Sequence, residues 1–389
     1  MRTAIIGAGF SGLVASSVMK KAGCDFKLFE ASQRAGKKIL ATGNGRCNIT
    51  NTCVDISRYH GNTDFAKAVL DNVSSGRLFE FFEDIGLLLM TEGDRVYPHS
   101  LRASEVLDLL RLSEGESEVC GAKVTKIIPH KKGLMVVYND KEEMFDNVLV
   151  ATGGKAAPKL SGGGSYELLT ALGHRVTELF PSIVQLKCDG TRALEGIKVR
   201  ADVKIGEMRD SGEVLFTSYG LSGPPVMQLS RGAKGKVLSL DLAPDMSFSE
   251  ICDYLKRKRA ISYMTVGNIF TGFINKKVGG AILKRTTDKK SQDKAGSLSE
   301  RDIKALASCV KNFEFKITDT MGFENAQVTA GGIDPADFDP GTMESKLIKG
   351  LYAAGEVLDV DGDCGGFNLQ WAFSSAYIAA ESIVKKGER

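Results

Sequence analysis

The sequence predicts an α/β fold in which one domain, built around a parallel sheet, is split in two by an insertion. Three observations lead to this prediction. An apolar run at the N-terminus meets a glycine-rich turn and a helical pattern, and a second strand, loop and long helix close the C-terminal end. Between about Pro181 and Gly331 the pattern changes to alternating segments, which are typical of antiparallel strands. We expect the split domain to cover residues 1–184 and 332–389, and the insertion to cover 185–331.

Composition narrows the class of protein. The 389 residues are 43% apolar and 25% charged, with a formal net charge of +3, as in an ordinary soluble globular protein. No apolar run approaches the ~18 residues of a membrane span, and Met1-Arg2-Thr3 leads directly into Ala4-Ile5-Ile6. We therefore expect no signal peptide, no membrane association and a cytoplasmic location. Eight cysteines without a C-x-x-C pair predict reduced thiols and no metal site.

The first thirty residues carry a dinucleotide-binding pattern. In GAGFSG, Gly7 makes the turn from strand to helix, Gly9 lets a pyrophosphate approach the helix N-terminus, and Gly12 permits close helix–strand packing. Glu30 ends the next strand, where its carboxylate accepts hydrogen bonds from a ribose diol. Gly-rich turns also occur in unrelated α/β domains. The strand, helix and acid around this one favour a bound dinucleotide, either FAD or NAD.

The polar stretch ATGNGRCNITN at residues 41–51 favours FAD over NAD. Gly43 and Gly45 permit close approach of the backbone to a ligand. Arg46 and Asn48 supply hydrogen-bond donors for an isoalloxazine ring, and the charge of Arg46 would stabilise a reduced, anionic flavin. Cys47 is expected to pack against the ring rather than act as a nucleophile. Taken alone, the stretch is also compatible with a surface loop that caps the next helix.

These motifs resemble those of the aminoacetone-oxidase-like family of FAD-binding NAD(P)/FAD-dependent oxidoreductases. That family is related to bile-acid dehydro-reductases and, distantly, to fumarate reductase flavoproteins. The resemblance covers nearly the whole chain and implies a two-part Rossmann-like FAD-binding domain with a parallel sheet and a β meander. It also implies that the insertion is a β subdomain carrying a small helical cap at about 246–311. The blocks that carry it, in order, are GKKILATGNGRCNITN, RVYPHSLRASEVLDLL, VLVATGGKAAPKLSGGGSYELLTALGH, GEVLFTSYGLSGPPVMQLS, AQVTAGGI and TMESKLIKGLYAAGEVLDVDGDCGGFNLQWAFSSAYIAA.

The remaining predicted cofactor contacts lie in these blocks. The strand at 146–150 ends in small residues that let its backbone lie near the adenosine, and the resemblance places a backbone group of Val124 at the adenine. A strand at 350–354 ends at Gly355-Glu356, and the helix after Gly366 points its N-terminus at the flavin pyrimidine edge. The predicted FAD-binding set is Gly7, Gly9, Phe10, Ser11, Gly12, Glu30, Ala31, Lys37, Lys38, Thr42, Gly43, Asn44, Gly45, Arg46, Cys47, Asn48, Val124, Ala151, Thr152, Gly153, Gly355, Glu356, Gly366, Phe367, Asn368 and Leu369.

The insertion is expected to roof the flavin and shape a substrate pocket. Pro224-Pro225 suits the start of a short helix, and Tyr219 and Ser222 beside it are, with Arg46, the candidate catalytic residues. Alternating strands are predicted at 199–205, 213–217 and 236–242, and helices at 248–258, 266–284 and 299–311.

A basic segment lies within this insertion. Residues 256–290 contain ten Lys or Arg and a single acid, Asp288. An RNA-binding patch is one interpretation, but aromatic residues suited to base stacking are few there. A solvated helical face is the commoner origin of such a run, so we expect no nucleic-acid partner.

The chemistry follows from one dinucleotide fingerprint. Gly162-Gly163-Gly164 lacks a preceding strand and a spaced acid, which disfavours a separate NAD domain. The four histidines lie in no context for covalent flavin attachment, so noncovalent FAD is predicted. We expect hydride transfer at flavin N5 in an NADH- or NADPH-linked reduction of an unsaturated or carbonyl-type small organic substrate. Two alternatives stay open: an aminoacetone-type amine oxidase that uses oxygen, and a flavin-binding redox sensor or RNA-modifying flavoprotein. No oligomeric state is predicted.

Overall fold

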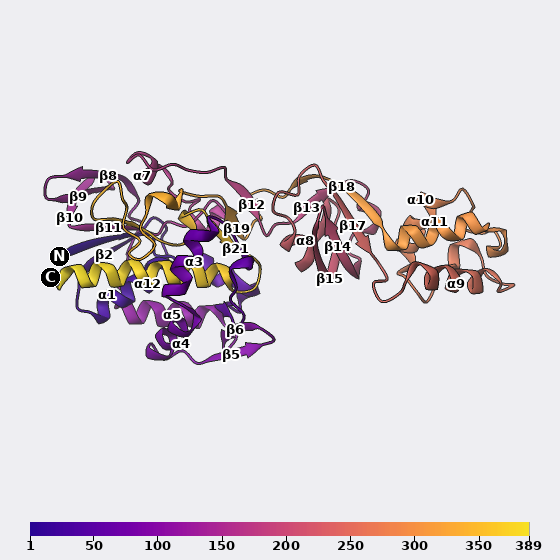
Figure 1. Ribbon diagram of the computed structural model, residues 1–389, viewed down its shortest axis with the longest axis horizontal. Coiled ribbons are helices and arrows are strands. Elements are labelled where there is room, and N and C mark those ends of the chain that lie inside the picture. Colours follow the sequence, from indigo (N-terminus) through magenta and orange to yellow (C-terminus); the bar gives the residue numbers. More distant parts are fainter. Residues whose placement is uncertain (389) are drawn as a thin grey trace. The chain divides into compact units, whose positions relative to one another are not determined.

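A computed structural model describes residues 1–388, and the chain forms two compact units (Figure 1). The first unit contains Met1–Pro181 together with the chain from Phe323 onward, and the second contains Ser182–Gly322. The second unit therefore ends at Gly322, nine residues before residue 331, the predicted end of the insertion. The segment after Phe323 returns to the first unit, where the Thr329 hydroxyl accepts a hydrogen bond from Ala156 N over 2.8 Å.

A five-stranded parallel sheet forms the centre of the first unit, in the order β20-β11-β1-β2-β7. Every residue of β11 is buried, and β1 is buried after its first residue, so both read as near-continuous apolar runs, as expected for strands covered on both faces. The predicted fold class, α/β with a Rossmann-like parallel sheet, is confirmed. The strands are β1 (Arg2–Ile6), β2 (Asp25–Glu30), β7 (Val119–Cys120), β11 (Asn147–Val150) and β20 (Leu351–Ala353).

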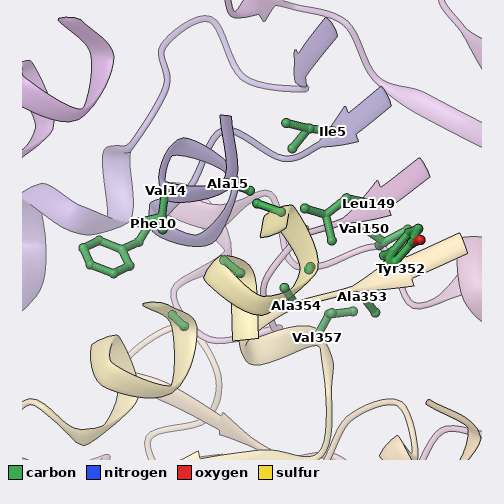
Figure 2. Packing of buried hydrophobic residues seen from close by; sticks show 14 of the residues in the cluster. Ile5, Phe10, Val14, Ala15, Leu149, Val150, Tyr352, Ala353, Ala354 and Val357 are labelled. Atoms are coloured by element: carbon green, nitrogen blue, oxygen red, sulfur yellow. The ribbon is translucent and has the colours of Figure 1, made fainter. Parts of the chain in front are cut away.

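Helices from both ends of the chain pack together on this sheet. Helix α1 (Phe10–Lys21) contacts α12 (Phe367–Gly387) and α5 (Ala103–Glu114). Figure 2 shows Val14 and Ala15 of α1, Leu149 and Val150 of β11 and Ala353 of β20 as members of one cluster of buried hydrophobic residues. Burying these apolar side chains joins the two sequence segments of the unit into one core. Each Å² of apolar surface removed from water stabilises the folded state by ~25 cal/mol.

The predicted β meander is a three-stranded antiparallel sheet, β10-β9-β8. Between β2 and β7 the chain also forms helices, and it contributes strands to two small sheets. These elements were not predicted from the sequence. The other elements of this unit are α2 (Lys37–Ala41), β3 (Thr50–Asn51), β4 (Tyr59–Gly61), α3 (Thr63–Asn72), α4 (Ser75–Asp84), β5 (Leu89–Glu92), β6 (Arg95–Pro98), β8 (Val124–His130), β9 (Gly133–Tyr138), β10 (Lys141–Phe145), α6 (Pro158–Ser161), α7 (Glu167–Thr170), β19 (Val328–Ala330) and β21 (Val360–Gly362). One further short strand, β12 (Phe180–Ser182), spans the boundary between the units.

The second unit contains a closed barrel of order β13-β16-β15-β14-β17-β18 and a group of helices. The alternating burial of β14 points every second side chain into a separate apolar core. Its elements are β13 (Leu186–Cys188), β14 (Lys198–Ile205), β15 (Met208–Phe216), β16 (Gly220–Ser222), α8 (Pro224–Gln228), β17 (Val237–Asp241), α9 (Phe248–Arg259), α10 (Lys276–Thr286), α11 (Glu300–Lys311) and β18 (Phe313–Thr320).

The helix predicted over 266–284 is wrong in its first half. A single turn of 3-10 helix occupies Val266–Asn268, and α10 begins only at Lys276. Asn275 caps that start, because its side chain accepts a hydrogen bond from the Lys277 amide, and Gly272 before it has a φ of +82°. Within residues 1–388, no helix combines the length and the apolar character needed to cross a membrane.

Candidate dinucleotide-binding site

The three glycines of the N-terminal turn have three different surroundings. A Cβ atom at Gly7 would overlap the Ala151 carbonyl, and one at Gly12 would overlap the Gly7 carbonyl oxygen. A Cβ atom at Gly9 would meet no atom within 4 Å. Gly7 and Gly12 therefore close the turn, whereas Gly9 borders open space at the N-terminus of α1. This is the arrangement that admits a phosphate to a helix N-terminus.

Glu30 is held at the end of β2 by two backbone amides. Its Oε2 accepts from Ala8 N over 3.0 Å and its Oε1 from Ser32 N over 2.7 Å. Each carboxylate oxygen can accept a further hydrogen bond. The geometry fits the predicted role of Glu30, because the acid is oriented before a ribose arrives.

Within the stretch 41–51, residues 43–45 form a strained, exposed turn. Gly43, Asn44 and Gly45 take consecutive left-handed conformations, with φ of 54°, 55° and 83°. Asn44 has a Cβ and is strained in this conformation, and such strain often marks a functional segment. Thr42 donates its hydroxyl to Ile39 O over 2.6 Å, so its side chain closes the preceding turn of α2.

Arg46 is engaged within the protein. Its guanidinium pairs with Glu92 Oε1 at 2.5 Å and lies 4.4 Å from the centre of the Tyr97 ring. The hydrogen bond to Glu92 raises the pKa of Arg46, so its charge is kept. Cys47 beside it is fully buried, and burial raises the pKa of its thiol to about 11. A thiol that stays protonated suits a packing role.

Asn48 joins this segment to the start of α12. In the amide orientation that satisfies both its ends, it donates to Val96 O (3.1 Å) and Thr50 O (2.9 Å) and accepts from Gly366 N (3.2 Å). Asn368 in turn accepts from Gly362 N over 2.9 Å and donates to Gly362 O over 2.7 Å. Asn48 was predicted to donate to the flavin, and Asn368 to lie at the helix end that points toward it. In the structure both amide side chains bond backbone around the helix N-terminus.

Two residues of the fingerprint have side chains that face the protein. The ring centres of Phe10 and Phe82 lie 6.2 Å apart, and the Ser11 hydroxyl donates to Ala372 O over 3.1 Å. At these positions the backbone amides, rather than the side chains, border the open space at Gly9.

The turn after β11 lies beside the end of β20. Thr152 Oγ1 is buried and has no hydrogen-bond partner in the described chain, and a Cβ atom at Gly153 would meet open space. Glu356 Oε2 accepts from Lys38 Nζ over 2.6 Å, which joins two predicted cofactor residues 318 positions apart. An unsatisfied hydroxyl beside an open glycine fits a bound polar ligand.

The other predicted residues are spread over both units. Val124 starts β8 and is buried, whereas Ala31 is exposed and Lys37 and Leu369 are half-buried. Tyr219 and Ser222 belong to the second unit, where Tyr219 is exposed and the Ser222 hydroxyl lies 4.0 Å from Met227 Sδ. Their catalytic role stays a prediction. Across residues 1–388 no group of three or more His, Cys, Asp or Glu is arranged to hold a metal ion.

Thr329 lies at the site but was not among the predicted site residues. Its hydroxyl accepts from Ala156 N over 2.8 Å while its own amide donates to Glu356, so it bridges the turn after β11 and the acid after β20. The block AQVTAGGI contains it, but nothing in that block's spacing distinguishes Thr329 from its neighbours.

Together, the turn at Gly9, the oriented Glu30 and the second turn after β11 define a Rossmann-type dinucleotide-binding domain. Residues 1–382 match the model of the HI0933-like protein Rossmann domain, and the chain belongs to that family. The predicted family and the predicted class of enzyme, an FAD-dependent oxidoreductase, are thereby confirmed.

Two relatives and one solved structure set the chain in context. A 3-dehydro-bile acid delta(4,6)-reductase of Clostridium scindens is 36% identical over 407 aligned positions, which cover 99% of each chain. A ribosomal RNA dihydrouridine synthase of Haemophilus influenzae is 29% identical, with 98% of each chain covered. A flavocytochrome c3 fumarate reductase in an open conformation shares the fold at 16% identity and a TM-score of 0.53, over 99% of this chain and 78% of that one.

Proposed function

We propose that the protein binds FAD noncovalently and reduces a carbon–carbon double bond conjugated to a carbonyl in a small organic substrate, with NADH or NADPH as electron donor. The observation that carries this proposal is the 36% identity over 99% of both chains to a reductase of 3-dehydro bile acids. A 3-dehydro sterol skeleton with double bonds at positions 4 and 6 is a conjugated ketone.

The residues of the first unit fit FAD. The open space at Gly9 and the N-terminus of α1 suit the pyrophosphate, and Glu30 suits the adenosine ribose. The N-terminus of α12 is tied to Asn48 and Asn51, which hold its positive end in place. Bound FAD supplies two-electron redox chemistry, and the protein orients it and tunes its charge.

The overall reaction adds two hydrogens to the substrate. One arrives as a hydride equivalent that originates in NADH or NADPH, and the other as a proton that originates in water. The nicotinamide leaves oxidised and the conjugated double bond leaves saturated, so atoms and electrons balance.

The ribosomal RNA dihydrouridine synthase bears on the class of substrate. Dihydrouridine is uridine with a saturated ring double bond, which is also conjugated to a carbonyl, so both named relatives act on the same type of bond. The higher identity to the bile-acid enzyme favours a small conjugated ketone over a base in RNA.

An anaerobic titration tests the proposal. NADH and then NADPH are added to the purified yellow protein while the visible absorption band of the flavin is followed. We expect bleaching by one of the two, and reoxidation by a 3-oxo-Δ4 steroid but not by uridine-containing RNA. A protein that is not bleached, but consumes oxygen with an amine, would replace the proposal by the amine oxidase alternative.

A further inference from the structure

A buried tyrosine lies beside the turn after β11 and has an unused hydroxyl. Tyr166 is 5% exposed, and no group in residues 1–388 makes a hydrogen bond of good geometry to its hydroxyl oxygen. The Thr329 hydroxyl and the Lys155 amide approach that oxygen from its acceptor side, so its proton is the part left without a partner. Leaving a buried hydroxyl unsatisfied costs about 1–3 kcal/mol. Natural proteins tolerate this cost mainly where a ligand or water completes the bond.

The glycine run 162–164 seats this ring against the turn. Gly162, Gly163 and Gly164 all have positive φ, at 74°, 86° and 72°. A Cβ atom at Gly164 would lie 3.0 Å from Gly153 O and 3.1 Å from Tyr166 Cε2. The run is not a second phosphate-binding loop. It lets the chain wrap closely enough to bring Tyr166 to Gly153, a predicted cofactor residue.

Polar groups from three further segments surround the phenol. Glu356 carries the bonds from Lys38 and Thr329, and a Cβ atom at Gly154 would lie 2.9 Å from Glu356 Oε1. Burial raises the pKa of Tyr166 and the Glu356 carboxylate raises it further, while hydrogen bonding toward the phenol oxygen from Thr329 and the Lys155 amide acts in the opposite direction. The phenol therefore stays protonated at neutral pH and is available as a donor.

The hydrogen-bonding groups favour one part of the cofactor. The charge of the Glu356 carboxylate is compensated by Lys38, and its oxygens only accept, so it suits a ligand hydroxyl, which can donate to a carboxylate oxygen and accept from a phenol at the same time. Glu356 keeps acceptor capacity after its bonds to Lys38 and Thr329, because each carboxylate oxygen has two lone-pair sites.

We propose that Tyr166 is a further cofactor-binding residue, which donates its hydroxyl proton to a hydroxyl of the ribityl chain of FAD beside Glu356. The proposal rests on the proposed binding of FAD. It assigns a role to a residue outside the predicted binding set and to the glycine run that precedes it.

Replacing Tyr166→Phe removes only the hydroxyl and tests the assignment. We expect the FAD dissociation constant, measured by the fluorescence of released flavin, to rise about tenfold, since a hydrogen bond of ~1.4 kcal/mol is tenfold in affinity. The unfolding temperature without added FAD should stay the same or rise, because an unsatisfied buried group has been removed. Protection of the protein by ADP, which lacks the ribityl chain, should be unchanged.

A matched control is Tyr352→Phe. Tyr352 is fully buried in the same unit, but its hydroxyl already accepts from Lys386 Nζ over 3.2 Å. This variant should lose stability and keep its FAD affinity. The proposal is overturned if Tyr166→Phe lowers stability and leaves FAD affinity unchanged, or if ADP protection falls as much as FAD affinity. Wild-type protein that binds no FAD would instead refute the proposed function.

Discussion

At the scale of single residues, the glycines of the N-terminal turn separate folding from binding. Gly9→Ala places a methyl group in open space, so the fold should be kept while FAD affinity falls by about tenfold. Gly12→Ala places a methyl group against the Gly7 carbonyl, and overpacking of this kind lowers the free energy of unfolding by about 2–3 kcal/mol. Urea unfolding and flavin fluorescence measure the two effects. Equal loss of stability in both variants would contradict the distinction.

Arg46 and Glu92 form a pair whose charge bears on the flavin. Arg46→Ala should weaken FAD retention or lower the flavin reduction potential, because a positive charge is lost. Glu92→Gln leaves the guanidinium unpaired and should move the potential upward. Spectroelectrochemical titration of both variants checks the opposite signs, and unchanged potential and retention in Arg46→Ala would remove Arg46 from the site.

Glu114 makes stability depend on pH. Burial raises the pKa of this carboxyl to about 7 from an ordinary 4.5, with Glu118 adding to the shift and Ser117 opposing it. The folded state therefore binds more protons than the unfolded state between these values, and stability falls as pH rises from about 4.5 to about 7.

The variant Glu114→Gln should remove this dependence. We expect a gain of roughly 2 kcal/mol at pH 8 relative to wild type and little change at pH 5. The control Glu105→Gln lies on the same helix but is exposed and should follow the wild type. Urea midpoints at both pH values decide the matter, and a parallel shift at pH 5 and pH 8 would rule out titration of Glu114.

At the scale of elements, the start of α12 depends on one amide side chain. Asn368 bonds both the amide and the carbonyl of Gly362, and also the Asp363 carbonyl over 3.2 Å. Asn368→Ala leaves these groups without partners and should cost about 1–3 kcal/mol. FAD should also dissociate faster, because the loop before the helix is released.

A substitution further along the same helix serves as the control. Lys385→Ala removes an exposed side chain paired with Glu381 and should change stability by less than about 0.5 kcal/mol. Stopped-flow release of flavin and thermal unfolding of both variants provide the comparison. Release at the wild-type rate from Asn368→Ala would show that the loop does not hold the cofactor.

At the scale of the whole molecule, each compact unit has its own apolar core. We expect calorimetry to resolve two unfolding transitions. Only one of them should rise with FAD concentration, because the predicted cofactor residues lie in the first unit and a ligand stabilises the unit that binds it. A single transition that moves as a whole would show that the units unfold together.

Much of the fold follows from local sequence patterns. The glycine spacing, the acid after β2 and the apolar runs of β1 and β11 each report on neighbouring residues, whose geometry is set by the period of a strand or helix. The same holds for α8, which starts at the predicted Pro224, and for α9 and α11, whose ends agree with the prediction within one residue. Where Asn275 and Gly272 divide a helical pattern, the local signal was read wrongly.

By itself, then, the sequence determined the Rossmann-type domain in two segments, because each strand, turn and helix start leaves a local mark. The resemblance of its motif blocks to a known family indicated the class of enzyme. Only the tertiary structure decided which polar groups are already engaged. Arg46 meets Glu92, Asn48 meets Gly366 and Lys38 meets Glu356 across long separations in sequence. It also closed the barrel and left the Tyr166 hydroxyl proton without a partner. Such pairings depend on how distant segments pack, and neither spacing nor periodicity along the chain records them.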